Sequence, residues 1–169
     1  MKKLFATLAL SLLCLNGFAQ DYVPTPENLQ ARKEFSDMKF GIFLHWGIYS
    51  MFAQGEWYMH NANIDWREYE KAASAFYPAN FDAEAWVKAI KDSGAKYITF
   101  TTRHHDSFSM WDTEHSDFNI VDATPYKKDV LKMLADECQK QGVTLNLYYS
   151  HLDWRREDHP QGRTGHGTH

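Results

Sequence analysis

A unit of helix, glycine and strand occurs twice in this sequence and limits the folds that the chain can adopt. In the first copy, a helix that Asp82 can cap is followed by Gly94 and then by residues 95–102, which are β-branched and aromatic. The second copy repeats this order with Asp129, a helix, a glycine and a strand at 143–149. Helices that alternate with strands predict βαβ units and therefore a parallel sheet.

Apolar residues at helical spacing indicate the faces by which these two helices pack. They are Trp86, Ala89 and Ile90 in the first helix, and Val130, Leu131, Leu134, Ala135 and Cys138 in the second. A third strand is expected earlier, at 40–47, where a dense apolar run predicts burial on both faces. A polar helix is expected at 27–38, a loop at 48–63, and a further helix at 65–76.

The kind of parallel sheet is indicated by the residues that follow its strands. A dinucleotide-binding fold would carry G-x-G-x-x-G after its first strand, and the sequence has none. Polar and aromatic residues instead follow each strand: His45-Trp46, His104-His105-Asp106 and Ser150-His151. Chemistry at the carboxyl ends of parallel strands is the rule in a (β/α)₈ barrel, which needs about 250 residues. The predicted fold class is therefore α/β, the first part of a TIM-like barrel truncated after about three strands.

The first nineteen residues are expected to be a signal peptide. Lys2 and Lys3 precede an apolar stretch too short to span a membrane, and Gly17-Phe18-Ala19 supplies small residues at a cleavage site. Residues 20–169 would then be the N-terminal portion of a catalytic barrel domain, exported to a bacterial periplasm or to the outside. Export would leave Cys138 as the single cysteine, so neither an internal disulfide nor a cysteine zinc site is expected.

Charge and composition exclude other classes. The formal net charge is −4, and loss of two lysines with the first nineteen residues would make it −6. Such a chain lacks the surplus of cations that neutralises phosphates, which argues against a nucleic-acid partner. No later apolar run is long enough for a transmembrane segment. Aromatic residues form 15% of the sequence, which favours a large core or a surface that stacks on flat ligands.

Several residues could carry chemistry, each with a structural alternative. His45 could bind a ligand hydroxyl or be a satisfied core histidine. Glu56 and Trp57 place a carboxylate beside an indole, as sugar sites do, but could also form an exposed loop with rings that hold it in place. Tyr148 shares a strand face with Asn146 and could direct its hydroxyl at a ligand.

Arg103-His104-His105-Asp106 is the most specific local signal. Neighbouring residues of a regular strand point to opposite faces, so both histidines can reach one pocket only where the strand ends or bulges. Asp106 could orient an imidazole. A metal site is the competing interpretation, which we rank lower because H-E-x-x-H and H-x-H spacings are absent.

Taken together, these motifs resemble the α-L-fucosidases, the retaining enzymes of glycoside hydrolase family 29. The resemblance is carried by Phe40-Gly41-Ile42-Phe43-Leu44-His45-Trp46-Gly47, Gly55-Glu56-Trp57-Tyr58, Thr101-Thr102-Arg103-His104-His105-Asp106 and Tyr148-Tyr149-Ser150. It implies a catalytic barrel followed by a β-sandwich, with the barrel incomplete and the sandwich absent here. It also implies that fucose hydroxyls are bound by His45, Glu56, Trp57, His104, His105 and Tyr148. Ser107 departs from the family, which usually has glycine there.

The resemblance also implies which catalytic group is missing. Retaining glycosidases use two carboxyl groups, one as nucleophile and one as acid/base. The family's nucleophile is an Asp in a Trp-Phe-Asp-like motif on a later strand, and these 169 residues contain no such motif. Glu56 is a candidate for the acid/base, although a later residue fits that role better. The catalytic residues are therefore unidentified, and the chain alone is expected to be inactive.

The expected function of the full-length protein is retaining hydrolysis of terminal α-L-fucosyl residues from a fucosylated oligosaccharide or glycoconjugate, without a cofactor. Two alternatives remain at this point. One is a catalytically dead fucose-binding module. The other, ranked lower, is a metal-dependent hydrolase built on His45, His104 and His105.

Overall fold

The computed structural model describes residues 22–156, so the expected signal peptide at 1–19 lies outside the described residues. The chain divides into two units, residues 1–37 and 38–169, which are described separately. The described part of the first unit contains most of helix α2 (Pro26–Met38), as the sequence predicts. No residue of α2 is buried, and the pairs Gln30–Glu34 and Lys33–Asp37 lie along its exposed surface at i,i+4 spacing.

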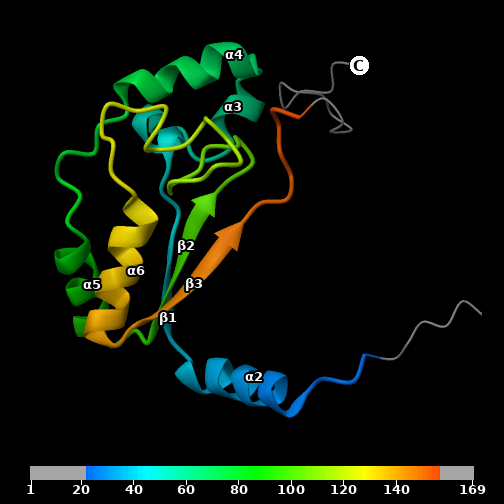
Figure 1. The fold of residues 1–169 in the computed structure, drawn as a ribbon, viewed down its shortest axis with the longest axis vertical. Helices are drawn as coiled ribbons and strands as arrows, with labels where there is room; N and C mark the ends of the chain where they lie inside the picture. Colours follow the sequence, from blue (N-terminus) through cyan, green and yellow to red (C-terminus); the bar gives the residue numbers. More distant parts are fainter. Residues whose placement is uncertain (1–21, 157–169) are drawn as a thin grey trace, which may run out of the picture. The chain divides into compact units, whose positions relative to one another are not determined.

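The second unit is built on a parallel sheet of three described strands: β1 (Gly41–Leu44), β2 (Tyr97–Arg103) and β3 (Thr144–Tyr149), in that order (Figure 1). This confirms the parallel sheet that the repeated unit predicts. The strands are in register, with Gly41 opposite Tyr97 and Tyr97 opposite Thr144. A Cβ at position 41 would lie 2.3 Å from the Tyr97 ring, so any residue other than glycine would require this ring to move.

Helices α5 (Ala83–Asp92) and α6 (Val130–Gln141) pack side by side on one face of this sheet (Figure 1). Both begin at the predicted caps: the Asp82 carboxylate accepts from the Ala85 amide, and that of Asp129 accepts from the Lys132 amide. Six buried residues from these helices and from β2 belong to one core: Val87, Ile98, Phe100, Val130, Leu134 and Cys138.

The predicted inner face of α5 is wrong at one position. Ala89 is exposed, whereas Ala83 and Val87 are buried and Trp86 and Ile90 are half-buried. Ala89 lies two positions after Val87, a rotation of about 200° around the helix axis, so its side chain points away from the buried stripe.

The first strand is also shorter and less buried than predicted. Residues 40–47 were expected to be buried on both faces, but β1 has four residues and Phe43 is 51% exposed. Phe43 pairs with Thr99, on the face opposite to that of Ile98 and Phe100, where the helices pack. Beyond β1 the chain turns, and the Trp46 ring packs against Phe81 and Trp86.

The segment expected to be a loop at 48–63 contains two short helices, a 3₁₀ helix η1 (Ile48–Phe52) and helix α3 (Tyr58–Asn61). Ile48 and Met59 anchor them, because both side chains are fully buried in the core. The helix expected at 65–76 is present as α4 (Trp66–Tyr69), capped by Asp65, and a 3₁₀ continuation η2 (Glu70–Ala75).

The structure thus shows an α/β arrangement of three parallel strands with two helices on one face. Closure of this sheet into a barrel remains a prediction. Within residues 22–156, none of the helices combines the length and the apolar character needed to cross a bilayer.

Candidate functional site

The segments that leave the carboxyl ends of the three strands bring His45, His104 and Tyr148 together. His45 directly follows β1, His104 directly follows β2, and Tyr148 is near the end of β3. The ring centroids lie 5.6 Å apart for His45 and His104, 6.1 Å for His45 and Tyr148, and 5.5 Å for His104 and Tyr148. Three residues far apart in sequence therefore form one cluster of polar rings.

Glu56 joins this cluster from the segment between η1 and α3. Its carboxylate and one ring nitrogen each of His45 and His104 all lie within 4.8 Å of one another. Gly55 supplies the turn just before it, with a φ of +85° that favours glycine. His45 is exposed, Glu56 is half-buried and His104 is buried, so the cluster opens to solvent at one side.

His105 and Trp57 form a second group beside the first. The ring centroids of His105 and His104 lie 4.3 Å apart, and those of His105 and Trp57 lie 5.1 Å apart, edge to face. Both histidines can reach the same region because β2 ends at Arg103, where the pairing with β3 shifts register. All six residues predicted to bind the ligand are thus in one continuous set of contacts.

Burial keeps His104 neutral. Its side chain has 4% exposure, and loss of solvation, followed by the nearby His105 and His45, lowers its pKa to about 4. Its Nδ1 atom has no hydrogen-bond partner among the described residues. A neutral imidazole with an unused buried nitrogen is suited to a ligand that supplies the missing partner.

Asp106 does not orient an imidazole, contrary to the sequence hypothesis. Its carboxylate is buried and accepts hydrogen bonds from the Tyr69 hydroxyl at 2.9 Å and from the Phe108 amide at 3.1 Å. Burial raises its pKa to about 6. Asp106 therefore links the loop after β2 to helix α4.

A buried ionic network supports the turn that carries the histidines. Asp153 pairs with the Arg103 guanidinium and accepts a hydrogen bond from the Ser107 hydroxyl. Ser107 has a φ of +72°, in the left-handed region that favours glycine. The departure from the family's glycine is thus compensated by a side-chain bond that glycine could not make. Asp153 therefore has a structural role in this turn.

Four neighbours of the site were not identified from the sequence as ligand-site residues. Tyr49 contacts the edge of His104 and bonds the Thr101 hydroxyl at 3.0 Å. Trp154 is fully buried and touches Trp57 and His105. The other two are His60, which stacks on Trp154, and Ser150, which bonds His105. Their positions depend on long-range contacts, for which the local sequence carries no signal.

A metal ion could be held by His45, Glu56 and His104, whose donor atoms are grouped closely enough. Two nitrogens and one carboxylate oxygen form a donor set that zinc accepts. The sequence suggested His45, His104 and His105 as the metal ligands. In the structure Glu56 takes the place of His105 in this set.

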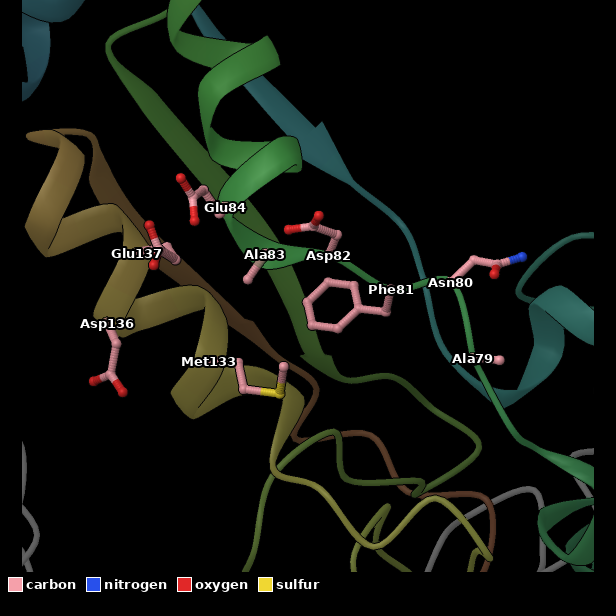
Figure 2. A pocket seen from close by; sticks show the side chains of 9 residues that line it. All are labelled: Ala79, Asn80, Phe81, Asp82, Ala83, Glu84, Met133, Asp136 and Glu137. Carbon is pink, nitrogen blue, oxygen red and sulfur yellow. The ribbon is translucent and has the colours of Figure 1, made fainter.

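A separate hollow of about 660 Å³ lies in the outer helical layer, between α5 and α6 (Figure 2). Carboxylates from both helices line it, but several already have structural partners. Asp82 caps α5, Asp136 pairs with Lys132, and Glu137 pairs with Lys140. These three carboxylates thus stabilise the helices, and none of the residues that line the hollow belongs to the ring cluster.

Comparison with known proteins gives a consistent result. Residues 10–168 match the family described as Alpha-L-fucosidase. The α-L-fucosidase of Dictyostelium discoideum is 34% identical over an alignment of 170 positions, gaps included, that covers 85% of this chain and 37% of that protein. The plasma α-L-fucosidase of Homo sapiens is 33% identical over an alignment of 162 positions that covers 83% of this chain and 34% of that protein.

Solved structures agree. The α-L-fucosidase AlfC from Lactobacillus casei, in complex with its α-L-fucose product, superposes with a TM-score of 0.70 and 38% identity, covering 77% of this chain and 42% of that chain. The α-L-fucosidase isoenzyme 1 from Paenibacillus thiaminolyticus gives a TM-score of 0.73 and 36% identity, covering 78% of this chain and 31% of that chain. The chain spans about a third of the length of the curated relatives that it matches. On this sequence match and this structural likeness, the chain belongs to the α-L-fucosidase family.

Proposed function

We propose that the full-length protein containing this chain is a glycoside hydrolase that releases terminal α-L-fucose from glycans with retention of configuration. The observation that carries the proposal is the convergence of His45, Glu56, His104 and Tyr148 at the carboxyl ends of three parallel strands, in a chain of this family. Active sites of (β/α)₈ enzymes are built at this end of the strands.

The chemistry of these groups fits a deoxyhexose. Ring hydroxyls need fixed donors and acceptors, which two imidazoles, a carboxylate and a phenol provide. The low pKa of His104 supports this role, because a neutral imidazole can both donate and accept. The C6 methyl group of fucose needs an apolar contact, and Phe43 is half exposed beside His45 and Tyr148.

The substrate class is supported by the relatives. The solved structures of AlfC include a complex with α-L-fucose and one with Fuc(α1,6)GlcNAc. For the present protein we propose a fucosylated oligosaccharide or glycoconjugate as the substrate.

Three further parts of the proposal extend the sequence expectations. The sheet would be the first part of a (β/α)₈ barrel, with the nucleophilic Asp on a strand outside this chain. Glu56 remains a candidate for the acid/base. Residues 1–19 would direct export to the periplasm or the outside.

The direct test is hydrolysis of 4-nitrophenyl α-L-fucoside by the full-length protein, with NMR detection of the anomer released first. The α anomer is expected, together with a loss of kcat/KM of at least tenfold for His104→Ala. His115→Ala is a matched control, because His115 is exposed and outside the cluster. Cleavage of another glycoside with no action on the fucoside would refute the proposal.

The same assay separates the alternatives. A binding module would retain fucose without turnover. A metal-dependent hydrolase would lose its activity on chelation and regain it with zinc.

A further inference from the structure

Ser150 makes two hydrogen bonds that compete for a single proton. Its Oγ lies 2.5 Å from Nδ1 of His105 and 2.7 Å from the carbonyl oxygen of Leu152. A carbonyl oxygen can only accept, so the hydroxyl proton must point at Leu152. A lone pair of Oγ then faces His105, whose Nδ1 must carry the proton between them.

We infer that Ser150 is a positioning residue that fixes His105 in its Nδ1–H form and thereby leaves Nε2 as a hydrogen-bond acceptor. This inference rests on the proposed function for its catalytic meaning, since His105 is one of the proposed fucose-binding groups. In water, neutral histidine prefers the opposite tautomer, with the proton on Nε2. The protein environment therefore has to impose the form assigned here, and Ser150 supplies the means.

The backbone around Ser150 is rigid enough for this task. Its amide donates to the Arg103 carbonyl at 3.0 Å, and its own carbonyl accepts from the Arg103 guanidinium at 3.4 Å. The His105 carbonyl accepts from the Trp154 amide at 2.9 Å, and the Trp154 ring packs on the imidazole. Ser150 is 5% exposed, so water does not compete readily for its hydroxyl. Segment 150–154 thus holds both the backbone and the ring of His105.

The assignment has a consequence for specificity. A ligand that hydrogen-bonds to an Nε2 acceptor has to supply the donor, which a sugar hydroxyl does and a fluorine or methoxy group cannot. A site whose polar groups have fixed donor and acceptor roles discriminates against analogues that lack the matching group. Ser150 would therefore set the preference for a free hydroxyl at the position that meets His105.

The decisive measurement is the imidazole tautomer in the full-length protein labelled with ¹⁵N-histidine. Two-bond ¹H–¹⁵N correlation spectra at pH 8 distinguish the two neutral forms, and His105→Gln identifies the signals by their loss. The Nδ1–H pattern is expected for His105 in the unmodified protein. The Nε2–H pattern would overturn the inference, whether or not any variant folds.

Variants then test the cause. In Ser150→Ala the tautomer is expected to shift toward Nε2–H, and kcat/KM for the aryl fucoside to fall by about tenfold, the effect of one hydrogen bond. Ser150→Thr keeps a hydroxyl and should restore both. Ser93→Ala is the matched control: its hydroxyl also donates to a carbonyl, that of Ile90, but at the end of α5. A folded Ser150→Ala protein with an unchanged tautomer would overturn the inference.

A ligand experiment provides an independent readout. Fucose analogues with fluorine at single positions are compared as competitive inhibitors of the two proteins. One position should lose affinity strongly in the unmodified protein and much less in Ser150→Ala. Equal losses in both proteins would contradict the specificity role. The tautomer spectrum needs no substrate, so absence of fucosidase activity would refute the proposed function without affecting the tautomer assignment.

Discussion

The ring of Tyr148 stacks on the ring of His104, with centroids 5.5 Å apart and planes inclined by 19°. The last residues of β3 thus cover the buried histidine that follows β2. Because loss of solvation is the main cause of the low His104 pKa, the covering ring and the protonation state of the histidine are linked.

We predict that Tyr148→Ala raises the pKa of His104 from about 4 toward 6.5, because water reaches the imidazole. Tyr148→Phe should leave that pKa unchanged, since the stacked ring remains, while kcat/KM falls about tenfold through loss of one hydrogen bond. NMR titration of the His104 ring measures the first effect, and fucoside hydrolysis the second. An unchanged pKa in Tyr148→Ala would show that other groups exclude the solvent.

Two buried groups give opposite dependences of stability on pH. The folded chain protonates Asp106 near pH 6 and the unfolded chain near 3.8, so this group increases stability as the pH falls across that window. For His104 the unfolded chain binds the proton near pH 6.5 and the folded chain only near 4, so stability decreases as the pH falls.

Asp106→Asn should therefore remove the opposing contribution of Asp106, so that His104 alone determines how the free energy of unfolding changes with pH in this range. The amide can still accept from the Phe108 amide and can donate to the Tyr69 hydroxyl, so the local bonds are retained. Relative to the unmodified protein, the variant should lose stability between pH 6 and 4, by at most about 1.4 kcal/mol per pH unit. Urea unfolding at several pH values provides the measurement. His104→Gln should show the opposite slope, and parallel curves for all three proteins would contradict the linkage.

The parts of the fold that the sequence predicts well are those with local signals. Asp82 and Asp129 cap their helices through amides three residues ahead, and Gly94 and Gly142 take positive φ values after those helices. The information needed for these features is contained within a few residues. The parallel arrangement follows because a helix between two strands leaves little other choice.

Several errors concern long-range partners. Asp106 was expected to orient a histidine ring, but its carboxylate binds the hydroxyl of Tyr69. Tyr69 lies 37 positions away, and nothing in the sequence around either residue indicates this contact. The length of β1 was overestimated because Trp46 is as apolar as a strand residue, yet packs on α5 through Trp86. The sequence predicted which residues belong to the site. It did not predict that Glu56 lies beside His45 and His104, because only folding brings these three residues together.

Zinc should compete with the sugar for the same atoms. The donor atoms of His45, Glu56 and His104 lie within 4.8 Å of one another, and small side-chain movements would bring them to zinc distances of about 2.0–2.2 Å. We predict that added Zn²⁺ raises KM for the fucoside with kcat unchanged, and that a chelator alone leaves the activity as it was.

Calorimetric titration of zinc distinguishes the two possible donor sets. Glu56→Gln should weaken zinc binding at least tenfold, because it replaces a carboxylate ligand with an amide. His105→Ala should retain zinc binding, since His105 is not among the clustered donors. Dependence on His105 rather than Glu56 would support the trio expected from the sequence.

Ser107 combines a strained backbone with a buried side-chain hydrogen bond. Two substitutions separate the contributions of the strain and of the bond to the free energy of unfolding. Ser107→Ala keeps the φ of +72° and loses the bond to Asp153, so a destabilisation of about 2 kcal/mol is expected. Ser107→Gly also loses the bond but relieves about 1 kcal/mol of left-handed strain, and should therefore be more stable than the alanine variant. Thermal unfolding of both variants measures the difference.

Asp153 provides the control for this pair. Its carboxylate keeps the Arg103 guanidinium and the Arg155 amide as partners when Ser107 is replaced, so the ionic network should persist in both variants. In the background of Asp153→Asn, the Ser107 hydroxyl loses its charged partner, so Ser107→Gly should destabilise the protein less than it does with Asp153 present. If the alanine variant were instead as stable as the glycine variant, the left-handed backbone would carry no measurable strain, and the usual glycine of the family at this position would need another explanation.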